Sequence, residues 1–172
     1  MPNEPVPVSE PVAPGHAFDL LEGVWSGEGT GEYPTIDTFH YRETLTFERR
    51  SETSLFYVQR TEKFLEGQAE PVTSHWESGF VEVREEGELQ LANVQIGGRG
   101  EVLTGYIERA GHSIKLFFKS QSLSNDTRMV ATSRIFELEG DTLRYEMDMA
   151  TTWVDELTLH VFATLQRVVP GR

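Results

Sequence analysis

The sequence of 172 residues contains no cysteine. This absence excludes disulfide frameworks, thiolate zinc sites, iron-sulfur clusters, cysteine nucleophiles and covalently attached c-type haem. A metal would therefore be held by histidine, by carboxylates or within a prosthetic group. The five histidines are scattered along the chain, and none belongs to a His-Glu-x-x-His motif that would indicate a zinc site on a helix.

Basic residues and long apolar runs are also scarce. Lys and Arg total 15 against 28 Asp and Glu, which gives a formal net charge of -13. A surface this negative repels phosphate backbones and anionic lipids, so we expect no nucleic acid partner. No run approaches the ~18 apolar residues of a membrane-spanning helix, and the N-terminus lacks the pattern of a signal peptide. We therefore expect no membrane partner and a cytoplasmic location.

Proline is concentrated at the N-terminus, where five of the eight prolines fall within the first 14 residues. Residues 1–14 are therefore predicted to be a disordered, Pro-rich tail. Residues 15–172 are predicted to form a single domain, which is the ordinary size for a chain of this length. Residues 17–22 offer a short helical turn that ends at Gly23.

Period-two alternation dominates the body of the chain. Between Thr142 and Met149, apolar side chains alternate with charged ones, which is typical of a half-buried strand. Turn signals separate this segment from further strand candidates at 24–30, 39–48, 54–64, 74–84, 89–96, 101–108, 113–120, 130–139 and 156–168. About ten sequential strands with short connections predict an all-β fold, an antiparallel up-and-down β-barrel. A barrel of this size is wide enough to enclose a cavity for a small molecule.

The last strand candidate carries His160. One of its faces is aliphatic, and the other is mostly polar and includes His160. From alternation alone, the aliphatic face is expected to point inward and His160 outward. Residues on the aliphatic face are Leu157, Leu159, Val161, Ala163 and Leu165.

The stretch GVWSGEGTGEYPTI, residues 23–36, is rich in glycine but lacks the lysine end and the following helix of a phosphate-binding loop. It resembles the GxWxGxGxGxYPTI signature of the nitrobindins, a family of haem-binding β-barrels. Three further segments resemble the family in the same order, so the resemblance covers residues 17–168. They are SHWESGF at 74–80, ANVQIGG at 92–98 and MDMATTWVDELTLHVFATLQR at 147–167.

This resemblance implies a ten-stranded barrel of the calycin or lipocalin type that holds one non-covalent haem b per chain. It implies that His160 is the proximal ligand of the haem iron, which reverses the orientation expected from alternation. His75 and Gln95 match positions on the distal side, while Met149 and Thr35 match positions that contact haem. The family's activity, isomerisation of peroxynitrite to nitrate by ferric haem, implies catalytic roles for His160 and His75. Nitric oxide is the other small ligand that the resemblance implies.

The sequence departs from the family pattern at two places. Ser74 stands where many relatives carry a larger apolar residue, which predicts a more open or more polar distal side. The connection 150–159 is slightly longer than in some relatives and contains Trp153 in place of an Asn-Pro turn.

Two other functions remain open. A barrel that binds lipid or another small hydrophobic ligand without redox chemistry would have the same strand pattern. A charged pair inside the barrel that holds a carboxylate head group, for which Arg134 and Arg60 are candidates, would favour it. A haem or nitric oxide sensor would require an effector domain. A homodimer is also left open.

Overall fold

The computed structural model describes residues 12–65 and 67–168, which form one short helix and ten strands. The helix is α1 (Pro14–Leu21), and a single 3-10 turn, η1 (Glu85–Gly87), precedes β5. The strands are β1 (Gly23–Tyr33), β2 (Ile36–Ser51), β3 (Ser54–Lys63), β4 (Val72–Val83), β5 (Leu89–Gln95), β6 (Gly100–Ala110), β7 (Ser113–Ser124), β8 (Met129–Glu139), β9 (Thr142–Thr151) and β10 (Thr158–Arg167).

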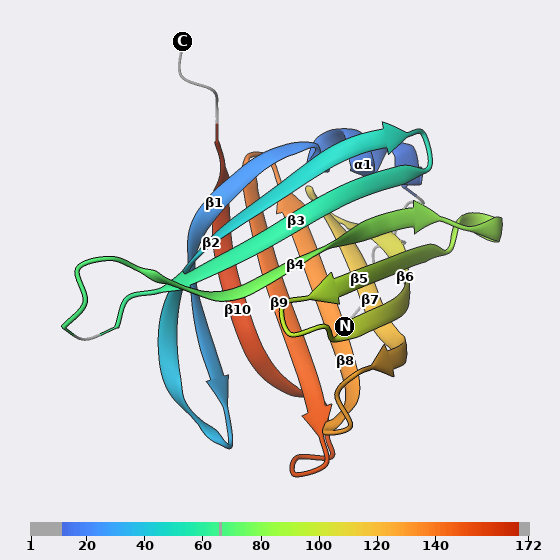
Figure 1. Ribbon diagram of the computed structural model, residues 1–172. Helices are drawn as coiled ribbons and strands as arrows, with labels where there is room; N and C mark the ends of the chain where they lie inside the picture. The colour runs from blue at the N-terminus through green and yellow to red at the C-terminus, as the bar shows by residue number, and fades with distance from the viewer. Residues whose placement is uncertain (1–11, 66, 169–172) are drawn as a thin grey trace, which may run out of the picture.

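Every strand pairs with its neighbours along the chain, and β1 pairs antiparallel with β10 to close the barrel (Figure 1). Closure leaves no sheet edge with unpaired backbone groups. The predicted all-β, up-and-down barrel with a short N-terminal helix is therefore confirmed. The helix begins at Pro14, where proline is favoured because the first helical N–H needs no partner. Most of the predicted tail, residues 1–11, lies outside the described residues.

The connections alternate between the two ends of the barrel, because successive strands run in opposite directions (Figure 1). The end with α1 and the β2–β3 connection is the closed end. Phe18 and Leu21 of α1 are buried there, and the indole N–H of Trp25 donates to the Leu21 carbonyl at 2.8 Å. Arg167 of β10 also donates to backbone carbonyls of the α1 segment and stacks on Trp25. The other end, with the β1–β2 and β9–β10 connections, is the mouth.

Three layers fill the interior from the closed end to the mouth. Strand β3 shows the sequence of layers, because its inward positions run from Leu55 and Tyr57 to Gln59 and then Thr61. The closed end is an apolar and aromatic core. Above it lies a buried polar layer, and above that layer a cavity opens at the mouth. Residues of the polar layer are Glu43, Gln59, Glu77, Asn93, Glu101, Thr132 and Arg134.

The glycines of β1 make room for aromatic rings of β2. A Cβ at Gly29 would lie 2.3 Å from the Tyr41 ring, and one at Gly31 would lie 2.0 Å from the Phe39 ring. Both rings line the cavity. The glycine-rich signature therefore allows two aromatic side chains to lean against the β1 backbone beside the cavity.

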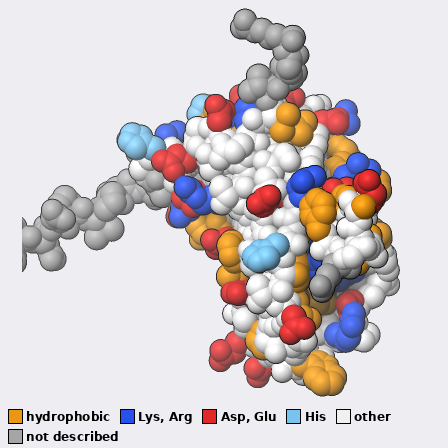
Figure 2. All heavy atoms as spheres, turned by 90° about the vertical axis from the view of Figure 1, so that its left-hand side faces the viewer, with side chains coloured by type: hydrophobic (Ala, Val, Ile, Leu, Met, Phe, Trp, Pro, Cys, Tyr) orange, Lys and Arg blue, Asp and Glu red, His pale blue; other side chains and the backbone are white. Residues whose placement is uncertain are grey.

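Charged side chains of both signs are spread over the outer surface. On the face shown in Figure 2, Asp and Glu side chains are mixed with Lys and Arg, so the formal charge of -13 is not gathered into one acidic patch there. In the described part of the chain, no helix has the length and apolar character needed to cross a membrane.

Candidate functional site

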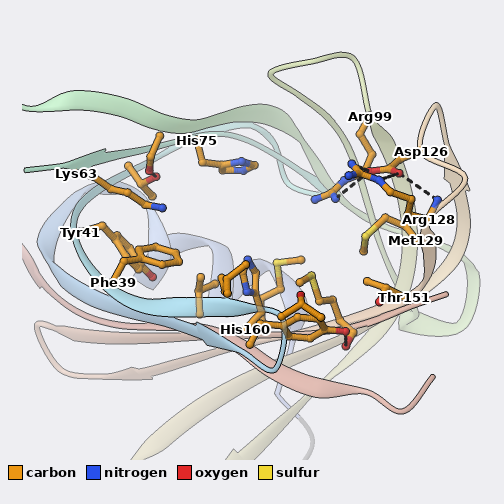
Figure 3. A pocket seen from close by; sticks show the side chains of 18 of the residues that line it. Phe39, Tyr41, Lys63, His75, Arg99, Asp126, Arg128, Met129, Thr151 and His160 are labelled. Carbon is orange, nitrogen blue, oxygen red and sulfur yellow. Dashed lines mark hydrogen bonds and ion pairs between the residues drawn. The ribbon is translucent and has the colours of Figure 1, made fainter. Parts of the chain in front are cut away.

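A cavity of about 660 Å³ opens at the mouth of the barrel. This volume lies within the range of ~300–1,000 Å³ that is usual for small-molecule sites. Figure 3 shows His75 and His160 on opposite sides of the cavity, with Lys63 and Phe39 on one flank and Arg99, Asp126 and Arg128 on the other.

His160 faces the cavity because the pairing of β10 with β9 shifts by one residue. Leu159 pairs with Asp148 and Val161 pairs with Met147, so His160 has no partner on β9. Such an irregularity turns two consecutive side chains toward the same side of a sheet. His160 and Val161 accordingly both line the cavity, while Ala163 continues the buried face. The outward orientation expected from alternation is wrong, since alternation cannot account for an extra residue in a strand.

Two aromatic rings pack against the imidazole of His160. The ring centroid of Tyr33 lies 5.7 Å away, edge to face, and that of Phe39 lies 6.4 Å away. The Tyr33 hydroxyl donates to the Met149 carbonyl at 3.3 Å, which joins β1 to β9 beside the site. These contacts restrict the orientation of the imidazole.

The His160 side chain is suited to be a neutral ligand. Its Nδ1 is buried and has no hydrogen-bond partner among the described residues. Burial lowers the pKa of His160, and the cations Arg99 and Lys63 lower it further. A hydrogen bond to the backbone of Glu32 opposes this effect. A neutral imidazole is the form that binds haem iron.

A shift in strand pairing next to His75 turns Ser74 toward the cavity as well. Thr61 pairs with His75 and Glu62 pairs with Thr73, so Ser74 has no partner on β3. Ser74 and His75 therefore both line the cavity, and the Ser74 hydroxyl shares a 2.7 Å hydrogen bond with Thr61. These two hydroxyl groups make the wall of the cavity beside His75 polar.

His75 connects the cavity to the buried polar layer. Its Nε2 lies 3.0 Å from Oε2 of Glu77, which is only 2% exposed. Glu77 in turn contacts Nη1 of Arg134 at 2.5 Å, and Nη2 of Arg134 contacts Glu101 at 2.6 Å. The Tyr57 hydroxyl donates to Oε1 of Glu77 at 2.7 Å.

The charges of this layer are strongly coupled. Burial alone would raise the pKa of Glu77, but attraction to Arg134 and hydrogen bonds from His75 and Arg134 outweigh it, and the pKa is lowered well below its usual range. Glu43 lacks such a cation partner. Burial raises the pKa of Glu43 to about 7, although a hydrogen bond from Gln59 opposes the rise.

The remaining residues implied by the resemblance lie in different surroundings. Thr35 lines the cavity in the β1–β2 turn, and Met149 lines it from β9. Gln95 is buried at the end of β5 but is not among the residues that line the cavity. Its amide oxygen accepts a hydrogen bond from Arg99, which does line it.

The two arginines considered for a carboxylate ligand do not offer a free site. Arg134 lies inside the barrel, but Glu77 and Glu101 already occupy its guanidinium. Arg60 stacks on Trp76, with its guanidinium carbon 3.8 Å from the ring centroid, and is exposed on the outside of the barrel. The structure therefore provides no support from these residues for a fatty-acid-type site.

Sequence reasoning missed Glu77, and it named Arg134 only as a candidate for a lipid-binding site. Glu77 lies two positions after His75 and so falls on the same face of β4, which is a readable signal. Arg134 falls on the same face of β8 as Phe136 and Leu138. A charged residue on a buried face requires a partner of opposite charge, but which strand supplies it depends on the closed barrel.

Comparison with protein families identifies the class of the chain. Residues 16–167 match the model of the "THAP4-like, heme-binding beta-barrel domain". Since the match covers nearly all of the described barrel, the chain belongs to this family of haem-binding β-barrels, and the nitrobindin resemblance is confirmed.

Individual relatives narrow the comparison. The chain is 35% identical over 167 residues to the Arabidopsis thaliana protein named peroxynitrite isomerase Rv2717c, covering 97% of this chain and 95% of the relative. It is 33% identical over 154 residues to the peroxynitrite isomerase of Nocardia farcinica, and the match covers 88% of this chain and 89% of the relative. The crystal structure of Rv2717c from M. tuberculosis matches with a TM-score of 0.81 at 28% identity, covering 92% of this chain and 99% of the other.

Proposed function

We propose that this protein is a haem-dependent peroxynitrite isomerase that holds one non-covalent haem b per chain and also binds nitric oxide. The observation that carries the proposal is the placement of His160, whose side chain lines a cavity of about 660 Å³ and whose buried Nδ1 has no hydrogen-bond partner among the described residues. The relatives named peroxynitrite isomerase, similar over nearly the whole chain, support the same activity.

The residues present fit a haem group. His160 would hold the iron, with Tyr33 and Phe39 keeping its ring in place. Met149 and Val161 would supply apolar contacts to the macrocycle. Bound ferric haem supplies an iron with one coordination position open to a small ligand.

The distal wall suits a small anionic reactant. Conversion of peroxynitrite to nitrate rearranges the same atoms and keeps the same charge, so it requires no external reductant. Ser74, Thr61 and His75 place polar groups on this wall, where they would orient the reactant. Lys63 adds a positive charge at the cavity, and none of the described carboxylates forms a salt bridge with it. This local charge would offset the long-range repulsion of an acidic protein.

Titration of the purified protein with haemin tests the cofactor, with His160→Ala as the variant. A saturable ferric Soret band at one haem per chain is expected, and it should be lost in His160→Ala. Stopped-flow measurement of peroxynitrite decay then tests the activity. Decay rates that are the same with buffer, haem-loaded protein and His160→Ala would refute it.

A further inference from the structure

The pair His75 and Glu77 stands at the boundary between the cavity and the buried layer. The imidazole is partly open to the cavity, with 32% of its side chain exposed, while the side chain of Glu77 is 1% exposed. Nε2 of His75 is committed to Glu77 at 3.0 Å. Nδ1 of His75 has no hydrogen-bond partner among the described residues, so it is the ring nitrogen left for a ligand.

Glu77 can act only as an acceptor toward His75. Its two oxygens contact Arg134, and the Tyr57 hydroxyl also donates to it. A carboxylate held by a buried guanidinium remains ionised, and an ionised carboxylate has no hydrogen to give. The hydrogen in the contact with His75 must therefore be carried by Nε2 of the imidazole.

This constraint decides which tautomer His75 adopts. We propose that Glu77 is a positioning residue that keeps a hydrogen on Nε2 of His75, so that Nδ1 is the atom presented to the small reactant in the cavity. In the protonated ring Nδ1 donates a hydrogen bond to the anion. In the neutral ring it accepts one from a protonated reactant or from water. The inference rests on the proposed function and adds the group that orients the distal histidine.

The buried layer also makes Glu77 difficult to displace. Arg134 bridges Glu77 on β4 and Glu101 on β6, so a buried cation holds the Glu77 carboxylate in addition to the contact with His75. The other carboxylate, Glu101, touches Arg134 without touching His75. Glu101 therefore provides a matched control, since Glu101→Gln and Glu77→Gln each remove one negative charge beside the same guanidinium.

The first test is the affinity of the ferric, haem-loaded protein for azide, measured by absorbance titration. Glu77→Gln should weaken azide binding about tenfold, which is the usual effect of losing one charge-assisted hydrogen bond. Glu101→Gln should change it less than twofold. His75→Gln should weaken azide binding as much as Glu77→Gln does. The double variant with His75→Gln and Glu77→Gln should bind azide no more weakly than His75→Gln alone. Equal losses in Glu77→Gln and Glu101→Gln, or additive losses in the double variant, would overturn the proposal.

The second test reads the tautomer directly, first in the unmodified protein and then in the two glutamine variants. In the diamagnetic ferrous carbonyl form, nitrogen-15 NMR of neutral His75 should find the hydrogen on Nε2. Glu101→Gln should keep this signature, while Glu77→Gln should show a mixture of tautomers. A hydrogen on Nδ1 in the unmodified protein refutes the role of Glu77. Neither test measures isomerisation, so an inactive protein with the expected tautomer would contradict the proposed function and leave the role of Glu77 intact.

Discussion

His160 and His75 face each other across the cavity, and each lies at a one-residue shift in strand pairing. Their surroundings differ in what the ring nitrogens contact. His160 keeps a buried Nδ1 without a partner and is packed by aromatic rings, whereas His75 is tied to Glu77 and through it to Arg134. The strand irregularities turn His160 and Ser74 inward. In the proposed function, the neighbours of each histidine decide whether it is free to bind the iron or is fixed as a hydrogen-bonding group.

The largest effect is expected when Arg134, the buried cation that holds Glu77 beside His75, is removed. Arg134→Met leaves the carboxylates of Glu77 and Glu101 buried without their partner, so we expect a loss of about 3–5 kcal/mol in the free energy of unfolding. Denaturant unfolding measures it. Arg60→Met, on the outside of the barrel, should cost less than about 1 kcal/mol. A haem-free His160→Ala that is destabilised as much as Arg134→Met would contradict the contrast.

Replacing each of the two histidines by alanine should have different effects on haem affinity. His160→Ala should lower it by more than about 100-fold, because the loss of a direct ligand exceeds the ~10–100-fold effect of losing a supporting contact. His75→Ala removes no iron ligand in the proposed function and should change the affinity less than about fivefold. Competition with a haem acceptor of known affinity measures both. The reverse order would assign the iron to His75.

A related contrast exists between two buried carboxylates, Glu77 with a cation and Glu43 without one. Folded Glu43 holds its proton up to a pH of about 7, whereas in the unfolded chain its pKa is near 4.5. Between these values the folded state binds more protons than the unfolded state, so stability falls as the pH rises through this window. Glu77, with a lowered pKa, loses its contribution only at pH values below 4.5.

Glu43→Gln should therefore be more stable than the unmodified protein by about 3 kcal/mol at pH 8 and about equal to it at pH 4.5. Chemical unfolding across this pH range measures the difference. The exposed Glu48, which pairs with Arg50, provides a control, because Glu48→Gln should show no such dependence. A constant difference between Glu43→Gln and the unmodified protein at all pH values would contradict the burial effect.

The smallest expected effect concerns the cation beside His160. The pKa of His160, followed by NMR in the haem-free protein, should lie below its ordinary value of 6.5. Lys63→Met should raise it, because Lys63 is one of the charges that disfavour the protonated ring. Lys119→Met makes the same change in net charge outside the cavity lining and should leave the pKa unchanged. A lower pKa in Lys63→Met would contradict this assignment.

Alternation predicts most of this fold because the barrel is built from strands with one buried face. The segment from Thr142 to Met149 becomes β9 almost as predicted. His160 could not be placed by the same rule, because it is an unpaired residue of β10 and points to the same side as its neighbour Val161. The family resemblance gave the inward orientation that the structure shows. The distal position that the resemblance implies for Gln95 stays a prediction. The Gln95 side chain accepts a hydrogen bond from Arg99 and is not among the residues that line the cavity.

The polar layer could not be predicted from the sequence for a different reason. Glu77 and Arg134 are 57 positions apart and come together only when the barrel closes. Local patterns report which face a residue occupies, whereas the pairing of charges across the interior depends on the number and tilt of the strands.

The register shift at His160 also bears on how such a site could be engineered. In a regular barrel, replacing one inward residue by histidine would deliver an imidazole but would turn none of its neighbours. Here β10 presents His160 and Val161 side by side because it holds one residue more than its partner strand. Transferring this site to another scaffold would therefore call for an insertion, and deleting the residue before His160 would turn His160 to the outer surface.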